Sequence, residues 1–251
     1  MRKKIAAGNW KMHKTLQEAE QTASALEAGI TNDPACQVWI APPAPYLATL
    51  AATFKKMTWG SQDLSQHDSG AFTGEWSSEM LHSCGAGFSL IAHSERRQYH
   101  REDDVLAHQK ILAALRHELT AVYCCGEHLS DREANDHFRI VENQIREALL
   151  ALSHDAMGHV VIAYEPVWAI GTGVTATTEQ AGEMHRFIRS TLADMFGDHI
   201  AASARILYGG SVKPGNAAEL FSDPDIDGGL VGGASLQADD FLAIIQAASA
   251  S

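Results

Sequence analysis

Short apolar runs alternate along the chain with longer stretches in which apolar residues have helical spacing. Several of the short runs are apolar at every position rather than at every second one, which is typical of parallel strands covered on both faces. The short runs predict strands at residues 4–10, 37–42, 57–62, 88–94, 119–127, 159–166, 205–211 and 226–233.

The longer stretches place apolar residues every three or four positions and charged residues on the opposite side, as amphipathic helices do. The first of them begins at a threonine and ends at a glycine, which are common helix start and stop residues. The clearest helices are expected at residues 15–29, 103–119, 137–153 and 177–197.

Eight strands that alternate with helices predict an α/β fold, a (β/α)8 barrel of parallel strands ringed by helices. A doubly wound sheet is the alternative, but it predicts a GxGxxG turn after an early strand, and the sequence has none there. We expect residues 1–251 to form a single barrel domain.

The composition excludes several classes of protein. The net charge of −12 argues against a nucleic-acid partner, because binding to a phosphate backbone needs a basic face. No apolar stretch approaches the roughly 18 residues that span a bilayer, so no membrane partner is expected. The basic N-terminus is not followed by an apolar segment, which argues against a secretion signal.

The cysteines and histidines show no pattern of metal ligands. Four scattered cysteines without metal-ligand spacing fit a reducing compartment, so we expect a cytoplasmic protein without a metal. The chain has 13 histidines but no HExxH pair. Most of them fall among polar positions of the expected helices, and we expect solvated side chains for His100, His108, His117, His137, His154 and His185.

Ionisable residues stand at the carboxyl ends of the expected strands, where a barrel enzyme carries its chemistry. Glu165 ends a buried run and is followed by Pro166. A carboxylate costs several kcal/mol to bury unpaired, so this position is either an exit to solvent or a placement for chemistry. Lys11 is either a surface lysine or a cation that attracts an anion and stabilises oxyanion charge.

His93 and the glycine pairs also admit two interpretations. His93 precedes a predicted helix start, where it either caps the helix or is held neutral by the positive end of the helix dipole. Gly-Gly pairs end the last two strands, beside Ser211 and at Gly232 and Gly233. Such pairs form tight turns, or their backbone N–H groups converge on a phosphate. Two pairs on consecutive strands favour the phosphate site.

Six separated motifs together resemble the triosephosphate isomerase family: GNWKM, AHSERR, YCCGE, AYEPVWAIGTG, YGGSV and LVGGASL. They occur in the family's order over nearly the whole chain. The resemblance implies an isomerase of glycolysis and gluconeogenesis that interconverts dihydroxyacetone phosphate and D-glyceraldehyde 3-phosphate through an enediolate, without metal or cofactor.

The resemblance also implies roles for individual residues. Glu165 would be the general base, His93 the neutral electrophile and Lys11 the substrate-binding cation. Asn9 would help to hold the oxyanion, and Glu95 would pair with Lys11. Phosphate would bind to backbone N–H groups, and residues 166–174 would form a lid. The phosphate-binding residues would be Gly171, Ser211, Gly232 and Gly233.

The stretch 69–77 resembles the family's interface loop and implies a homodimer. Phe72, Thr73 and Gly74 would insert beside the partner's active site. The sequence departs from the family pattern at Ala92, where glycine is usual, and at Asp63, where asparagine is common. Neither change removes a catalytic group.

Two other functions remain open at this point. A different phosphate-binding barrel isomerase would need a wider pocket, and a non-catalytic scaffold would keep only the fold. Both would be free to lose members of the set Asn9, Lys11, His93 and Glu165, which is complete here.

Overall fold

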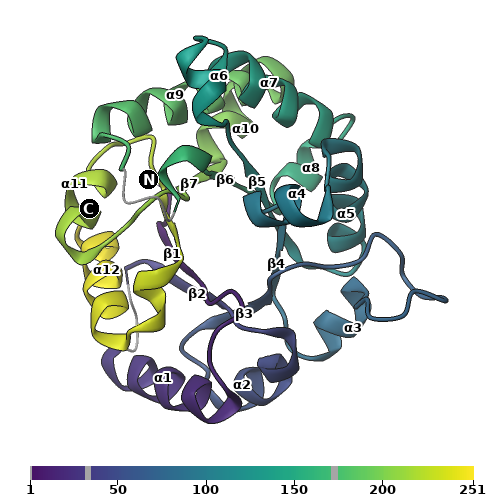
Figure 1. Cartoon of the computed structure of the whole chain (residues 1–251), viewed down its shortest axis with the longest axis vertical. Coiled ribbons are helices and arrows are strands. Elements are labelled where there is room, and N and C mark those ends of the chain that lie inside the picture. Colours follow the sequence, from purple (N-terminus) through teal and green to yellow (C-terminus); the bar gives the residue numbers. More distant parts are fainter. Residues whose placement is uncertain (1, 32–34, 171–174) are drawn as a thin grey trace.

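The computed structural model describes residues 2–31, 35–170 and 175–251. Eight parallel strands pair in sequence order, and the last pairs with the first to close a barrel (Figure 1). The strands are β1 Ile5–Asn9, β2 Gln37–Ala41, β3 Thr58–Ser61, β4 Phe88–Ile91, β5 Thr120–Cys125, β6 Val160–Tyr164, β7 Arg205–Tyr208 and β8 Gly228–Val231. Each lies within a predicted run, so the strand prediction and the barrel are confirmed.

Helices surround the barrel on its outer side (Figure 1). The α-helices are α1 Leu16–Gly29, α2 Leu47–Thr53, α3 Ser78–Ser83, α4 Ser94–His100, α5 Asp104–Arg116, α6 Leu129–Glu133, α7 His137–Ala148, α8 His154–Met157, α9 Thr178–Phe196, α10 Asp198–Ser203, α11 Pro214–Phe221 and α12 Ala238–Ala250. Short 3-10 helices are η1 Ala44–Tyr46, η2 Val167–Ala169 and η3 Gly233–Leu236. Within the described ranges, every helix is too short or too polar to cross a membrane.

The start of α1 follows from its sequence. The Glu18 N–H donates to the Thr15 hydroxyl at 3.4 Å, and the Glu18 carboxylate accepts from the Thr15 N–H at 2.7 Å. This reciprocal pair satisfies backbone donors that the first turn would otherwise leave unpaired. The predicted start at a threonine is therefore confirmed.

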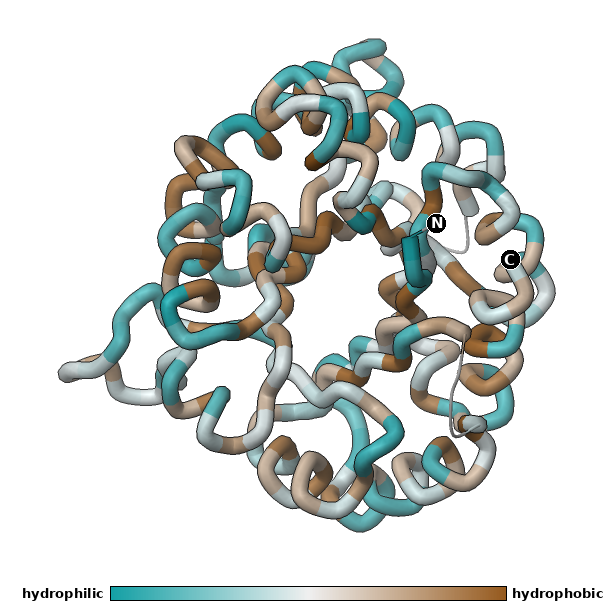
Figure 2. Tube along the Cα trace, turned by 180° about the vertical axis from the view of Figure 1, so that it is seen from behind, coloured by the Kyte–Doolittle hydropathy of each residue, from teal (hydrophilic) through white to brown (hydrophobic). Residues whose placement is uncertain are grey.

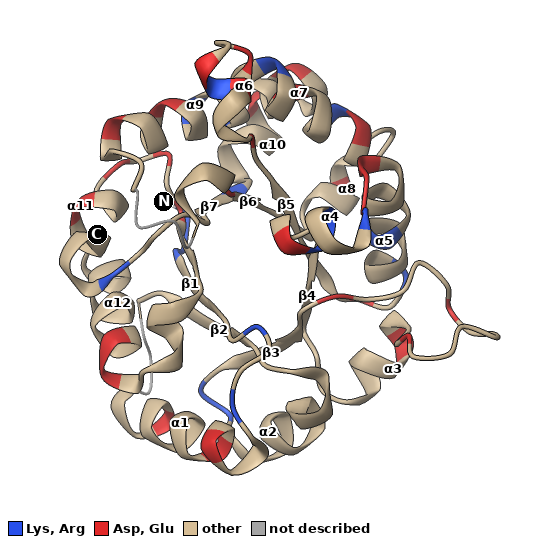
Figure 3. Cartoon of the chain, viewed as in Figure 1, with Lys and Arg blue, Asp and Glu red and all other residues tan. Residues whose placement is uncertain are grey.

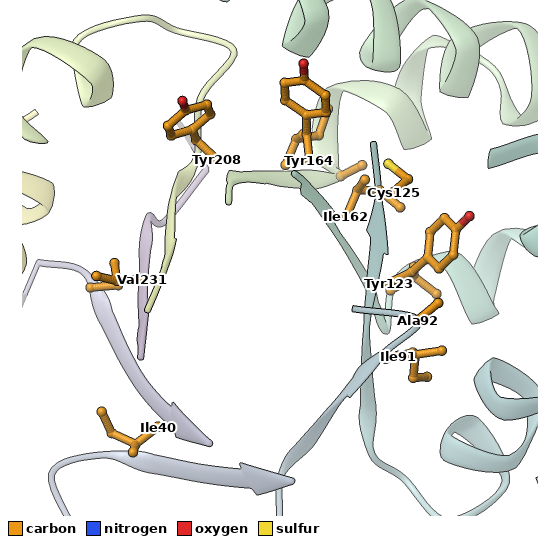
Figure 4. Close-up of a cluster of buried hydrophobic side chains, with 14 of the residues drawn as sticks. Ile40, Ile91, Ala92, Tyr123, Cys125, Ile162, Tyr164, Tyr208 and Val231 are labelled. Atoms are coloured by element: carbon orange, nitrogen blue, oxygen red, sulfur yellow. The ribbon is translucent and has the colours of Figure 1, made fainter. Parts of the chain in front are cut away.

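The strands separate two apolar regions, because successive side chains point to opposite faces. Trp39 and Phe88 stack inside the barrel with ring centroids 4.8 Å apart. The larger region lies between strands and helices, and Figure 4 shows its side chains on the outer faces of the strands. Apolar positions accordingly run along the strands in Figure 2. The adjacent Cys124 and Cys125 fall in different regions, inside and outside the barrel.

His185 corrects the expectation of a solvated histidine. Its side chain on α9 is fully buried, Nδ1 lies 3.3 Å from the Asp225 carbonyl oxygen, and its ring lies edge-on to that of Tyr164. Burial lowers the pKa of His185 to about 4. His185 lies on the same buried face of α9 as Ala181 and Ile188. The helical spacing therefore predicts a buried position, although histidine is polar.

The buried His185 should make stability depend on pH. Between the ordinary pKa of 6.5 and about 4, the unfolded chain takes up a proton that the folded chain excludes. The free energy of unfolding should therefore fall by about 3 kcal/mol as the pH is lowered through this range. Urea denaturation of the parent and of His185→Gln at a series of pH values measures the contribution. The variant should show a shallower pH dependence, whereas His154→Gln, at an exposed site on α8, should match the parent. Identical curves for the parent and His185→Gln would contradict this assignment.

Candidate active site

A pocket of about 500 Å³ lies at the carboxyl ends of the strands. It collects residues that are far apart in the chain, because parallel strands in a closed barrel all end at the same rim. The lining residues are Asn9, Lys11, His93, Glu165, Ile170, Gly209, Gly210, Ser211, Val212, Lys213, Pro214, Leu230, Gly232, Gly233, Ala234 and Asp240. The barrel therefore brings most of the predicted site residues to one pocket.

Glu165 follows β6 directly, and only 2% of its surface is exposed. One carboxylate oxygen lies 2.9 Å from His93 Nε2, and the other accepts from the Ser94 N–H at 2.8 Å. Burial raises the pKa of Glu165, but the His93 ring and the Ser94 N–H more than offset it, so the net pKa is lowered. Glu165 is thus a buried carboxylate that is ionised at neutral pH.

His93 is the N-cap residue of α4, and its Nδ1 accepts from the Glu95 N–H at 3.3 Å. An accepting Nδ1 carries no proton, so the neutral ring has its proton on Nε2, the atom that faces Glu165. Burial lowers the pKa of His93, and the neighbouring Glu165 carboxylate raises it. The effect of the carboxylate outweighs that of burial, so the net pKa of His93 is raised. If the carboxylate moved away, burial would remain and would favour the neutral imidazole.

Lys11 and Asn9 form a rigid corner at the end of β1. Lys11 has a left-handed backbone, with φ of +50°. Its N–H donates to the Asn9 side-chain oxygen at 3.0 Å, and its carbonyl accepts from Gln62 at 2.8 Å. The ammonium group lies 2.6 Å from the Glu95 carboxylate. Glu95 does not line the pocket itself, but it contacts the lysine that does.

Two glycines leave room for Glu165 on the strands next to β6. A Cβ atom at Gly126 would lie 1.7 Å from the Glu165 carbonyl oxygen, a backbone position that could not give way. A Cβ atom at Gly209 would lie 2.8 Å from Glu165 Cγ. The glycine of the YCCGE motif and the first glycine of YGGSV therefore set the space in which Glu165 sits.

The predicted phosphate residues come later in the sequence than Glu165 but line the same pocket. Ser211 follows β7, and Gly232 and Gly233 follow β8 at the start of η3. The Ser235 hydroxyl donates to the Gly232 carbonyl at 2.7 Å and so fixes the direction of this turn. Gly171 lies outside the described residues.

The sequence analysis assigned no role to Glu127, which lies just after β5. The side chain is fully buried, and one carboxylate oxygen accepts from the Tyr164 hydroxyl at 3.0 Å, Trp168 Nε1 at 2.8 Å and Arg132 at 3.1 Å. The cluster joins the end of β5 to η2, directly after Pro166. Tyr164 and Trp168 flank Glu165 in the YEPVW sequence. Their hydroxyl and indole N–H groups beside a buried strand end were the feature of the sequence that indicated a buried acceptor such as Glu127.

Phe72, Thr73 and Gly74 lie away from this pocket, in a loop between β3 and α3 that projects from the barrel (Figure 1). Phe72 is partly exposed and stacks on His67 with ring centroids 3.8 Å apart. A second pocket of about 400 Å³ lies beside the loop, and Thr73 is among its lining residues.

A cluster of charged residues that the sequence analysis also missed lies beside this second pocket, and three of its members, Arg96, Glu102 and Lys110, line the pocket. Lys110 Nζ lies 2.6 Å from both the Asp63 and the Glu102 carboxylates, and Arg96 also pairs with both of them. Burial raises the pKa of Asp63 to about 6, despite the nearby cations. The cluster connects β3 to α4 and α5 beneath the projecting loop.

The described residues contain no group of three or more His, Cys, Asp or Glu side chains that could hold a metal ion. The charged groups of the pocket are therefore the lysine, histidine and carboxylate side chains described above, together with the exposed Lys213 and Asp240 at its rim.

Comparison with known proteins gives the family. Residues 4–248 match the model of a family described as triosephosphate isomerase. A triosephosphate isomerase of Flavobacterium johnsoniae is 51% identical over 249 residues, covering 98% of this chain and 100% of the relative. Those of Xanthomonas oryzae pv. oryzae and Porphyromonas gingivalis are 49% and 47% identical, covering 100% and 98% of this chain and all of each relative. The chain belongs to the triosephosphate isomerase family.

Proposed function

We propose that the chain interconverts dihydroxyacetone phosphate and D-glyceraldehyde 3-phosphate, with Glu165 moving a proton between adjacent carbons through an enediolate. The reaction is a step of glycolysis and gluconeogenesis, and the names of the relatives support it. The observation that carries the proposal is the placement of an ionised, buried Glu165 opposite His93 and near Lys11 in one pocket. The family match favours this reaction over a larger sugar-phosphate substrate or a scaffold role.

The chemistry requires that the base and the electrophile act together. A proton on carbon next to a carbonyl is weakly acidic, so a carboxylate removes it only if the charge of the enediolate is stabilised. The His93 Nε2–H, the Lys11 ammonium and the Asn9 side-chain amide are donors that line the pocket. A single Nε2–H cannot serve both Glu165 and a substrate oxygen. Substrate binding should therefore release the carboxylate from His93 and direct it to carbon.

The phosphate group takes no part in the bond changes, but its binding energy can position the triose. Ser211, Gly232 and Gly233 offer backbone N–H groups on the side of the pocket formed by β7 and β8. Asn9 ends β1, which pairs with β8, and the Lys11 side chain lies next to Gly232. We therefore assign phosphate binding to the glycine turns and oxyanion binding to Asn9, Lys11 and His93. Gly171 stays a predicted phosphate residue.

This mechanism uses no metal or cofactor, because side chains supply every proton and positive charge it needs. A coupled assay with glyceraldehyde 3-phosphate tests both the reaction and this requirement. Turnover should persist after dialysis against EDTA. A loss of turnover that added metal restores would contradict the proposal, and a purified protein without turnover would contradict the function itself.

We also propose that the chain is a cytoplasmic homodimer. The projecting loop exposes Phe72 and Trp76 by 42% and 44%, and neighbouring Met80 on α3 by 55%. Such a concentration of apolar surface suits a protein contact. Thr73 would then approach the partner subunit's Lys11 and support its backbone.

Within the described ranges Cys36, Cys84, Cys124 and Cys125 are all unpaired, which suits a reducing compartment.

Glu165→Asp should retain substrate binding and lose turnover. Shortening the side chain withdraws the carboxylate by about 1 Å, and a misplacement of this size can cost on the order of 10²-fold in rate. Steady-state kinetics should show a large fall in kcat with a small change in KM. Glu142→Asp, on the outer surface of α7, is the control and should behave as the parent. Parental turnover in Glu165→Asp would remove Glu165 from the role of base.

Gly209→Ala should act on the same carboxylate from the neighbouring strand. The added methyl group would press on Glu165 Cγ, so the contact of the carboxylate with His93 should lengthen and kcat should fall on the order of 10-fold. A crystal structure and kinetics measure the two effects. Gly215→Ala is the control, because a methyl group there meets no atom within 4 Å. An unmoved Glu165 with a parental kcat would show that Gly209 does not define its space.

Thr73→Arg should weaken the dimer and lower activity in parallel, since it places a charged side chain in the loop that we assign to the interface. Sedimentation velocity and the coupled assay, performed over the same range of concentrations, compare the two. Ser130→Arg on α6 is the control for the added charge. A fully active monomer would refute the proposed contribution of the loop to the partner's site.

A further inference from the structure

The backbone immediately before His93 has an unusual conformation. Ala92 joins β4 to His93 and has φ of +57°, in the left-handed region that favours glycine. An L-residue in this region has a steric cost that glycine does not have. The Ala92 methyl group is fully buried in the outer apolar region, near Ile91 and Tyr123 (Figure 4). The conformation matters because it sets the direction in which the His93 side chain leaves the strand.

Arg97, one turn into α4, binds the carbonyl group of this strained residue. Its Nε donates to the Ala92 oxygen at 3.0 Å. Its Nη2 donates to the Cys124 carbonyl at 3.0 Å and to the Asp104 carboxylate at 2.7 Å. The guanidinium thus connects the end of β4, the end of β5 and the start of α5 to the helix that His93 caps.

The guanidinium is held on several sides and stays charged. It lies over the Tyr123 ring, 5.7 Å from the centroid, and Nη2 also lies 3.1 Å from the Tyr123 hydroxyl. Burial opposes the charge, but Tyr123 and Asp104 outweigh it, so the pKa of Arg97 is raised. A planar donor fixed in this way can hold a carbonyl in one direction, which a flexible ammonium group does less well.

We propose that Arg97 is a positioning residue for His93: by binding the Ala92 carbonyl, it holds the strained peptide that directs His93 Nε2 into the pocket. The inference rests on the proposed function of His93 as electrophile. Arg97 does not line the pocket, so its removal should affect the placement of His93 rather than contacts with substrate.

Arg189 provides a matched control for a purely structural effect. It is a similarly buried arginine on α9 that pairs with Asp225 at 2.7 Å and donates to the Ala201 and Ala204 carbonyls at 2.7 and 2.9 Å. Ala201 and Ala204 precede β7 and Asp225 precedes β8, so these contacts lie at the amino ends of the strands, at the opposite end of the barrel from the pocket. Loss of either arginine should lower stability, but only Arg97 is connected to His93.

The test compares Arg97→Lys with Arg189→Lys by urea denaturation and steady-state kinetics. Both variants should be less stable than the parent. Arg97→Lys should also lose on the order of 10-fold in kcat, with KM changed less than about 2-fold, while Arg189→Lys keeps the parental kcat. A parental kcat in Arg97→Lys, or an equal loss in both variants, would overturn the proposal.

A second test measures the effect of Arg97→Lys on kcat in an Ala92→Gly background. A purely structural role of Arg97 would give the same effect in both backgrounds. Glycine adopts positive φ without steric cost, so the backbone before His93 should then depend less on Arg97. The loss of kcat caused by Arg97→Lys should become at least about 3-fold smaller in the Ala92→Gly background, as a coupled pair requires. The same loss in both backgrounds would overturn the link through Ala92.

Two further variants separate a folding defect from a failure of the proposal, and the positioning role of Arg97 from the proposed function of His93. If Arg97→Lys does not fold, Asp104→Asn loosens the guanidinium while keeping it, and should lower kcat without raising KM. An unchanged kcat there would overturn the proposal. His93→Gln tests the proposed function itself. Full turnover in His93→Gln would remove both claims, whereas an inactive His93→Gln with a fully active Arg97→Lys would remove only the positioning role.

Discussion

The contact between the Glu165 carboxylate and the His93 Nε2–H is the interaction on which the site depends. A carboxylate that is 2% exposed would be costly without partners, and here the His93 ring and the Ser94 N–H stabilise its ionised form. The same contact brings the proposed base and the proposed electrophile within 2.9 Å of each other before any substrate is considered. The same contact therefore stabilises the buried carboxylate and places the two proposed catalytic groups next to each other.

The fold provides this contact by bringing together strands that are not neighbours. Glu165 follows β6, whereas His93 and Ser94 follow β4, and β5 lies between them. Glycine at position 126 leaves room for the Glu165 backbone and glycine at position 209 for its side chain, and the Ser94 N–H at the start of α4 donates to the carboxylate. The site is thus built from short connections at the rim, while the apolar interior and the outer helices hold that rim in place.

The sequence was sufficient to predict the strands, the closed barrel and the gathering of Asn9, Lys11, His93 and Glu165 at one rim. These follow from hydrophobic spacing and from the rule that parallel strands end together. The Glu165–Ser94 contact could not be predicted, because it depends on how the barrel closes across an intervening strand. Glu127 and the Asp63 cluster were missed since their partners are distant in sequence. His185 was misjudged because burial overrode its polarity.

The distribution of charge supports the view that local geometry, rather than overall charge, selects the substrate. The chain carries a net charge of −12, and Figure 3 shows acidic residues spread over the outer helices. An anionic substrate must therefore be bound by donors that are already oriented. Lys11 has this property because Glu95, Asn9 and Gln62 fix its side chain and backbone.

The most direct test of the central claim is a high-resolution crystal structure of the protein with dihydroxyacetone phosphate bound. We expect the Glu165 carboxylate to leave Ser94 and lie against the two carbons that exchange the proton, and His93 Nε2 to lie within hydrogen-bond distance of the substrate oxygens. A complex in which Glu165 stays on Ser94 and His93, with the triose out of reach of both, would contradict it.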